Sequence, residues 1–168
     1  DKKTFKVAAE ETGKMLAKNK WRLVYGAGDI GLMGALANGC QNNGGNTFGV
    51  IPKHLLQEEV GKTDLSTFII TESMHERKKL MFTNCNAIVT LPGGVGSLDE
   101  FFEILTWTQL GISTKPLYLL NIDGYWDLVI QLIDQMVNQG FAEGSLLNKF
   151  TIINSVAELE TNLLNIFS

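Results

Sequence analysis

Short apolar runs alternate with longer segments of helical periodicity along this chain. In residues 5–18 the apolar side chains recur at helical spacing, which predicts an amphipathic helix. Short apolar or β-branched runs, several of them bounded by glycine or proline, predict strands. The predicted strands are residues 21–25, 46–51, 67–71, 87–91, 117–121 and 150–153, and the other predicted helices are residues 34–43, 73–85, 97–110, 126–138 and 155–166.

Strand and helix alternate throughout, which is typical of an α/β fold with a doubly wound, mostly parallel sheet and helices on both faces. No repeat or linker interrupts the pattern, so we predict a single domain over residues 1–168. A doubly wound chain normally begins on a strand, whereas this sequence begins on a helix. Either the order of elements is unusual or a first strand lies upstream, and we expect the second. Ligands bind such sheets beyond the carboxyl ends of the strands, here the loops after Tyr25, Ile51, Thr71, Leu91 and Asn121.

Composition narrows the class of protein. The chain has 168 residues, a net charge of -4 and 45% hydrophobic residues, enough for one domain with a real core. No apolar run approaches the roughly 18–20 residues of a membrane span, and the mild acidity gives no broad field for nucleic acid, so we expect neither partner. The two cysteines have no CxxC partner, and neither histidine has metal-ligand spacing. We therefore predict free thiols, no metal site and a reducing, cytoplasmic compartment.

Three glycines stand between the predicted strand at 87–91 and the helix at 97–110, in the segment Pro92-Gly93-Gly94-Val95-Gly96-Ser97. Glycine allows a ligand to approach the main chain closely, and the first amides of a helix are unpaired and partly positive. The segment therefore predicts an anion site, most simply for phosphate, with Ser97 as a helix cap and hydroxyl donor. The alternative is a tight turn with a serine cap. A Walker A loop is disfavoured because Ser97 stands where its lysine would be.

Another glycine segment, the first along the chain, is Gly26-Ala27-Gly28-Asp29-Ile30-Gly31, which follows the strand at 21–25 and matches the spacing G-x-G-x-x-G. A dinucleotide site would also need an acidic residue about 20 residues further on, at the end of the next strand. Residues 50–53 include no acid, so NAD or FAD binding is disfavoured and we expect no cofactor. Close helix packing, or a second wall of a nucleotide pocket, explains the glycines better.

Charged side chains stand close to these loops. Asp99 is explained by the helix dipole, which favours acids in a first turn. Glu100 either closes a capping box with Ser97 or points into the pocket beside the phosphate loop. Arg77 and the two lysines after it lie early in a predicted helix, where the dipole disfavours cations, and they indicate an anion to bind. The alternative is a solvated basic face.

Five segments together point to one known family: LVYGAGDIGLMG, GVIPKHL, MHERK, LPGGVGSLDEFFEILTW and LGISTKPLYLLNIDGYWD. In this order they closely resemble the LOG family ("lonely guy"), whose members are cytokinin riboside 5′-monophosphate phosphoribohydrolases and were often mislabelled lysine decarboxylases. The resemblance covers nearly the whole chain. It includes a specific signature, PGGxGTxxE with an upstream MHxRK.

The resemblance implies a Rossmann-like fold, a homodimer or higher oligomer, and hydrolysis of the N-glycosidic bond of a nucleoside 5′-monophosphate such as AMP or N6-prenylated AMP. Matched by motif, it implies Arg77 and Glu100 as the catalytic pair. The residues matched to substrate-contacting segments are Glu59, Lys78, Gly93, Gly94, Val95, Gly96, Ser97, Leu98, Asp99 and Thr106. There are two departures: Ser97 replaces the usual threonine but keeps the hydroxyl, and Ala27 stands where many members have glycine.

These residues suggest a mechanism. We expect Glu100 to stabilise the oxocarbenium character of the sugar and to position or deprotonate the attacking water. The phosphate would lie on the amides of residues 94–97, and Arg77 would hold phosphate or sugar oxygens or orient Glu100. Glu59 and a bound water are the candidates for protonating the departing base. Three other functions stay open: a non-catalytic nucleotide-binding or carrier protein, a general AMP nucleosidase, and a pyridoxal-phosphate decarboxylase that uses Lys78.

Overall fold

The chain forms two compact units that divide between Cys85 and Asn86, and the computed structural model describes residues 2–167. In the N-terminal unit, the strands β1 (Leu23–Tyr25), β2 (Thr47–Pro52) and β3 (Thr67–Thr71) form a parallel sheet in the order β1-β2-β3. The helices of this unit are α1 (Lys2–Lys18), α2 (Gly31–Gln41) and α3 (Met74–Thr83), and a short 3₁₀ helix, η1 (Lys53–Leu55), follows β2.

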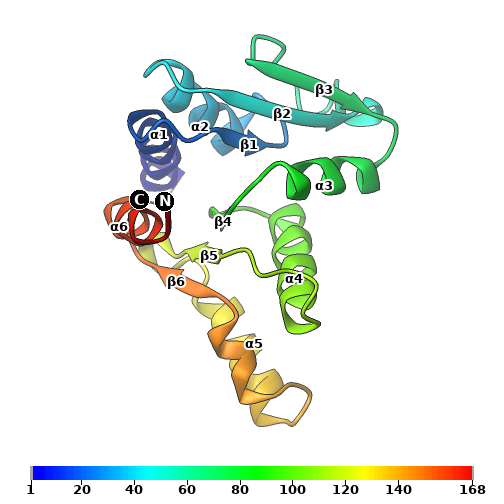
Figure 1. Cartoon of the computed structure of the whole chain (residues 1–168), viewed down its shortest axis with the longest axis vertical. Helices are drawn as coiled ribbons and strands as arrows, with labels where there is room; N and C mark the ends of the chain where they lie inside the picture. Colours follow the sequence, from blue (N-terminus) through cyan, green and yellow to red (C-terminus); the bar gives the residue numbers. More distant parts are fainter. Residues whose placement is uncertain (1, 168) are drawn as a thin grey trace. The chain divides into compact units, whose positions relative to one another are not determined.

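Helices cover both faces of this sheet. The helix α2 packs against β1 and β2, and α3 packs against β2 and β3; Figure 1 shows these two helices on opposite sides of the strands. The helices α1 and α2 approach each other closely. A Cβ added at Gly13 or Gly39 would overlap main-chain atoms of the facing helix, so glycine at these two positions allows the approach. The central strand β2 is buried along its whole length, as expected for a strand covered on both faces.

The C-terminal unit repeats the same construction. Its strands β4 (Ile88–Thr90), β5 (Leu117–Leu120) and β6 (Thr151–Ile153) form a second parallel sheet in the order β4-β5-β6. The helices are α4 (Val95–Gln109), α5 (Asp127–Asn138) and α6 (Val156–Phe167), labelled in Figure 1. The unit also contains two short 3₁₀ helices, η2 (Ile122–Gly124) and η3 (Gly144–Asn148). The core is apolar: Leu119 and Leu120 of β5 are fully buried, and Phe101 of α4 meets Phe150 edge to face with ring centroids 5.6 Å apart.

The predicted α/β fold with parallel strands is confirmed, and every predicted helix and strand is present with ends shifted by a few residues. Two boundaries were wrong. Pro52 does not stop the second strand: it is the last residue of β2, opposite Thr71, at a position beyond the part of β2 that pairs with β1. The helix predicted at 97–110 begins at Val95, with Gly94 as its N-cap. The single domain over residues 1–168 stays a prediction.

Two further expectations concern membranes and metals. None of the helices described in residues 2–167 combines the length and apolar character that crossing a bilayer requires. Within the same residues, no group of three or more histidine, cysteine or acidic side chains is arranged to hold a metal ion. Within residues 2–167 neither Cys40 nor Cys85 forms a disulfide; Cys40 is buried and Cys85 is half-buried.

Candidate active site

Arg77 lies at the carboxyl edge of the first sheet, on the first turn of α3. Ser73 caps this helix, because its hydroxyl accepts a hydrogen bond of 3.2 Å from the amide of Glu76. The carboxylate of Glu76 in turn accepts from the amide of Glu72 at 2.9 Å. This reciprocal capping fixes the first turn of the helix, and with it the direction in which the Arg77 side chain leaves the main chain.

The guanidinium of Arg77 is enclosed by the protein, since the residue is only 5% exposed. Its Nε donates to the carbonyl oxygen of Val50 in β2 at 3.1 Å, and its Nη2 donates to the carbonyl oxygen of Gly26 after β1 at 2.8 Å. A Cβ at Gly26 would overlap Nη2, so the glycine at this position is needed for the guanidinium to approach. The first glycine of the Gly26–Gly31 segment therefore makes room for an arginine.

Arg77 has an anionic partner within the chain. Glu59 Oε2 lies 3.0 Å from Arg77 Nη2 in an ion pair of which both members are largely withdrawn from solvent. The expected unfavourable effect of the helix dipole on Arg77 is thus offset by one carboxylate and two carbonyl groups. The alternative, a solvated basic face, fits the exposed Lys79 and not Arg77, while Lys78 is half-buried.

Glu59 reaches Arg77 from the segment between η1 and β3. The amide of Glu59 donates to the carbonyl of Leu55 at 2.9 Å, which continues the turn begun by η1. The carbonyl of Glu59 accepts from the amide of Asp29 at 3.1 Å, which ties this segment to the first glycine loop. The loops that leave the carboxyl ends of β1 and β2 therefore meet the guanidinium of the arginine that follows β3.

In the C-terminal unit, the second glycine loop lies at the carboxyl end of β4 and begins α4. The first helical hydrogen bond runs from the amide of Leu98 to the carbonyl of Gly94 at 3.3 Å. The amides of residues 95–97 therefore precede the first bond within the helix, and Gly94 offers no side chain to cap them. Residues 94–96 are exposed, and a Cβ at Gly94 or Gly96 would meet open space. This is the arrangement of an anion site at a helix N-terminus.

The earlier start of α4 corrects the roles of three side chains. Ser97 is not the N-cap, because it lies inside the first turn, so Glu100 cannot close a capping box with it. No acidic residue lies in the first turn, so the dipole argument for Asp99 loses force with its place in the second turn. Glu100 is half-buried and follows Ser97 by three residues, which places the two on one face of α4.

Tyr125 is a residue that the motif analysis did not single out. Its hydroxyl donates to the carbonyl oxygen of Gly93 at 2.6 Å, which fastens the glycine loop to the loop after β5. Asn121 holds that second loop, because its side chain accepts from the amide of Trp126 at 2.7 Å and donates to Asp127 Oδ1 at 2.8 Å. Two sequence signals pointed to this part of the site: Asn121 follows a strand end, and the segment LGISTKPLYLLNIDGYWD, which contains both Asn121 and Tyr125, resembles the family.

The predicted residues divide between the two units. Arg77 and Glu59 are in contact in the first unit, with Lys78 beside them on α3. The others lie in the second unit, in the glycine loop and on α4: Gly93, Gly94, Val95, Gly96, Ser97, Leu98, Asp99, Glu100 and Thr106. Thr106 is exposed, and its hydroxyl donates to the carbonyl of Phe102 at 2.7 Å within the helix. That Arg77 and Glu100 act on one substrate stays a prediction.

Solved structures support the fold. A molybdenum cofactor binding protein from Rippkaea orientalis matches with a TM-score of 0.75 at 21% identity, covering 98% of this chain and 89% of that one. The molybdenum cofactor carrier protein from Chlamydomonas reinhardtii matches with a TM-score of 0.71 at 20% identity, covering 98% and 88%. At these identities the likeness extends to the fold alone.

Several proteins are more similar to this chain in sequence than these structures are. A rice protein (Oryza sativa subsp. japonica) named probable cytokinin riboside 5'-monophosphate phosphoribohydrolase LOG4 is 41% identical over 160 residues, which cover 95% of this chain and 70% of the relative. The rice protein LOGL9, with the same activity in its name, is 44% identical over 140 residues, but the match spans only 62% of its length. LOG2 from Arabidopsis thaliana, a cytokinin riboside 5'-monophosphate phosphoribohydrolase, is 38% identical over 145 residues, or 86% of this chain and 68% of the relative.

The family model described as "Possible lysine decarboxylase" matches residues 33–163. That match covers most of the chain, and it includes both Arg77 with its ion pair to Glu59 and the glycine loop that begins α4. Together with about 40% identity to the named phosphoribohydrolases over most of the sequence, it shows that the chain belongs to the LOG family.

Proposed function

We propose that the protein hydrolyses the N-glycosidic bond of a nucleoside 5′-monophosphate, either AMP or an N6-prenylated AMP. The oxygen of a water molecule forms a bond to C1′ of the ribose while the bond from C1′ to the base nitrogen breaks. The base leaves with the bonding electron pair and takes up a proton, and the water loses one. The products are the free base and ribose 5-phosphate.

The observation that carries this proposal is the uncapped N-terminus of α4. Its first amides lie in an exposed glycine loop with open space around Gly94 and Gly96, and its partial positive charge suits a phosphate monoester. Binding energy from the phosphate would hold the ribose in place for reaction, which is how remote contacts lower a barrier at the reacting carbon.

We assign to Glu100 the carboxylate role of the reaction. It lies one turn beyond Ser97 on the same helical face, so a sugar whose phosphate rests on the loop would have its ring near this side chain. A carboxylate at that position stabilises the oxocarbenium character of the ribose and can accept a proton from the attacking water.

Arg77 and Glu59 are assigned to binding and orientation. Arginine stays protonated at any working pH, so it is a poor proton donor. The Nε and Nη2 groups of Arg77 already donate to carbonyl and carboxylate oxygens of the protein, whereas Nη1 makes a long 4.0 Å contact with Met74 Sδ, so Nη1 is the group that would donate to a sugar or phosphate oxygen. Glu59 uses Oε2 for the ion pair, and its other oxygen would accept from a ribose hydroxyl.

We also propose that the protein works as a homodimer. Several large apolar side chains of the second unit are exposed, among them Leu110 at 66%, Leu128 at 77% and Phe141 at 88%, which favours a protein partner. Light scattering coupled to size-exclusion chromatography would measure the molar mass of the protein in solution. A monomer at micromolar concentration would contradict this part of the proposal.

The activity is tested by incubating the protein with AMP and with N6-isopentenyl AMP and quantifying the free base by chromatography. Both nucleotides should release base, while adenosine, which lacks the phosphate, should be a much poorer substrate. The variant Glu100→Gln should lower kcat by at least about 100-fold. The matched control is Glu103→Gln, one turn further along α4, which should retain activity. Full activity in Glu100→Gln would overturn the assigned role.

Two other functions predict different results. A carrier protein would bind AMP in calorimetry without releasing base. A lysine decarboxylase, the activity in the description of the family model, would consume lysine and show the visible absorbance of pyridoxal phosphate.

A further inference from the structure

Residues 56–62, which we call the strap, cross over the loop that follows β1. The amide of Lys62 donates to the carbonyl of Ala27 at 2.8 Å, and the amide of Asp29 donates to the carbonyl of Val60 at 3.1 Å. Between these bonds Gly28 and Gly61 form an antiparallel bridge. The strap therefore pairs with the first glycine loop as a short antiparallel ribbon, and it carries Glu59 to Arg77.

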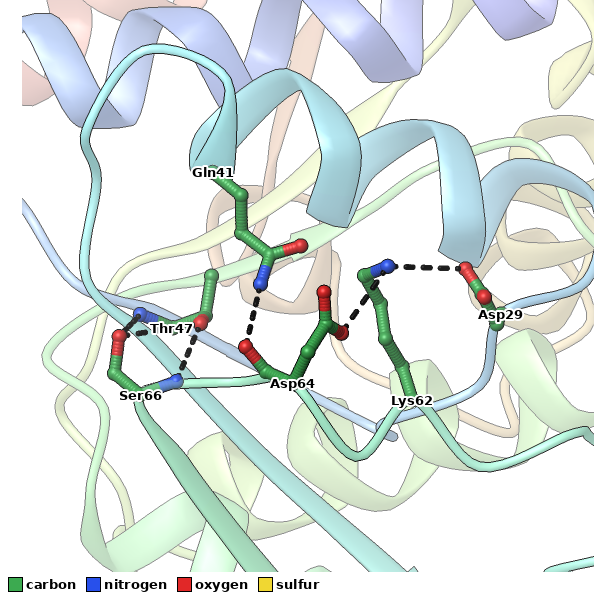
Figure 2. A network of polar contacts seen from close by, with 6 residues as sticks. All are labelled: Asp29, Gln41, Thr47, Lys62, Asp64 and Ser66. Atoms are coloured by element: carbon green, nitrogen blue, oxygen red, sulfur yellow. Dashed lines mark hydrogen bonds and ion pairs between the residues drawn. The ribbon is translucent and has the colours of Figure 1, made fainter.

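The side chain of Lys62 holds the strap from two directions. Its Nζ lies 3.5 Å from Asp29 Oδ1 and 3.3 Å from Asp64 Oδ1, as Figure 2 shows. The carbonyl of Asp64 in turn accepts from Gln41 Nε2 at 2.9 Å, which connects this cluster to the end of α2 (Figure 2). One ammonium group thus bridges the glycine loop and the segment that leads into β3.

Lys62 differs from an ordinary surface lysine. Its side chain is only 10% exposed, while its partners Asp29 and Asp64 are 38% and 69% exposed, so water and salt screen the pair with Asp29 less than the pair with Asp64. A withdrawn ammonium needs its carboxylate partners, and losing them would leave a buried charge without compensation. The Lys62 contacts therefore constrain the chain more than a surface pair would.

The strap also contains a strained residue that needs such constraint. Val60 has φ of 49°, a left-handed conformation that is costly for a β-branched residue, and its side chain is 52% exposed. Packing of the Val60 side chain therefore does little to hold this conformation. The bonds on either side, from Asp29 and Lys62, hold it instead.

We propose that Lys62 is a positioning residue that fixes the strap, and through it the Glu59 carboxylate on Arg77. Only the catalytic consequence of this inference rests on the proposed function; the positional consequence stands by itself. Without the Lys62 contacts the strap would open from the glycine loop, and Glu59 would leave the guanidinium.

The positional consequence is tested by NMR on the intact protein. In the wild type, the Nε–H of Arg77 and the amides of Asp29 and Lys62 should exchange slowly with solvent, because each donates a hydrogen bond. In Lys62→Met all three should exchange faster, by about tenfold or more, a change of about 1.4 kcal/mol in the opening equilibrium. Lys62→Arg should restore slow exchange, and Lys14→Met, an exposed lysine of α1, should leave it unchanged.

Activity with AMP gives the second measurement. Lys62→Met should lower kcat about tenfold or more with a smaller change in KM, since misplacing a group in the site costs more in the transition state than in binding. Lys62→Arg should recover most of this loss. A wild-type protein without activity, but with the expected exchange pattern, would overturn the proposed function and leave the positioning role intact.

Unchanged exchange at Arg77 Nε–H in Lys62→Met would overturn the inference, whatever the activity. Should Lys62→Met fail to fold, Asp29→Asn replaces it, because this variant keeps the side-chain size and removes one charge of the pair. The same faster exchange is then expected, and slow exchange at all three sites would contradict the proposal.

Discussion

The guanidinium of Arg77 occupies the space beside Gly26 that the side chain of any other residue would need. The hydrogen bond from Nη2 to the Gly26 carbonyl is 2.8 Å long, so the two residues pack in direct contact. The arginine and the glycine thus form one structural element, although they stand 51 positions apart in the sequence.

Replacing Gly26 by alanine should displace Arg77. The added Cβ would overlap Nη2, so the guanidinium would lose hydrogen bonds that involve a charged donor, at a cost of about 2–3 kcal/mol in the free energy of unfolding. Urea denaturation measures this loss. Gly144→Ala is the control, because a Cβ there would meet open space and stability should stay within about 0.5 kcal/mol. Equal stability of the two variants would contradict the packing described.

Gly96→Ala separates folding from ligand binding at the start of α4. Gly96 lies within the helix with open space around it, so alanine should keep the stability or raise it by up to about 1 kcal/mol. The new methyl group would stand where a phosphate approaches the amides, so the affinity for ribose 5-phosphate should fall at least about tenfold. Calorimetry with ribose 5-phosphate, and with adenosine as the ligand without phosphate, measures the effect. An unchanged affinity for ribose 5-phosphate would place the phosphate elsewhere.

Tyr125→Phe removes the hydroxyl that fastens the glycine loop. Loss of the 2.6 Å bond to the Gly93 carbonyl should cost about 1 kcal/mol, which corresponds to about a fivefold weaker binding of ribose 5-phosphate if the loop is the phosphate site. Binding of adenosine should change less. If both ligands weaken equally, Tyr125 supports the unit as a whole and not the loop.

Tyr25→Phe should leave the protein at least as stable at neutral pH. Tyr25 is 5% exposed, and within residues 2–167 its hydroxyl has no hydrogen-bond partner, so removing it relieves a buried polar group. Chemical denaturation at pH 7 should show an unfolding free energy equal to or above that of the wild type. A loss of more than about 1 kcal/mol would reveal a bond that the structure does not contain.

The same tyrosine affects stability at high pH. Burial, and secondarily the nearby Asp29 and Asp64 carboxylates, raise the pKa of Tyr25 well above its ordinary value. The unfolded chain then releases this proton first, so the stabilisation is complete below the unfolded pKa of about 10 and is lost as the pH rises above it. Tyr25→Phe should therefore lose less stability than the wild type between neutral pH and strong alkali.

Much of the fold could be predicted because its elements are marked locally. A run of β-branched and apolar residues indicated β3 with its observed bounds, and apolar runs next to glycines indicated β1 and α4 to within a few residues. The start of α4 was misplaced because glycine is a poor helix former, and only the bond from the Leu98 amide to the Gly94 carbonyl shows that the helix already includes Val95 and Gly96.

The contacts of the site could not be predicted in the same way. Nothing local to Arg77 indicates that its partners are the carbonyls of Gly26 and Val50, because these come together only when β1, β2 and α3 are packed. Tyr125 reaches the carbonyl of Gly93 because Asp123 and Gly124, in the turn before it, both have positive φ. A sequence motif does not show the direction in which such a turn sends the next side chain. Ala27, which departs from the glycine common in the family, has φ of 58°, a conformation that favours glycine.

The long sequence separation between Arg77 and its hydrogen-bond partners also determines when this part of the protein can fold during synthesis. The carbonyls of Gly26 and Val50 leave the ribosome 51 and 27 residues ahead of the arginine that will bind them. Until residue 77 emerges, these two carbonyl groups lack the guanidinium donor that they have in the folded chain. A chain stalled before α3 would therefore expose these groups to chaperones and to other chains, and the arrival of one arginine would close them off.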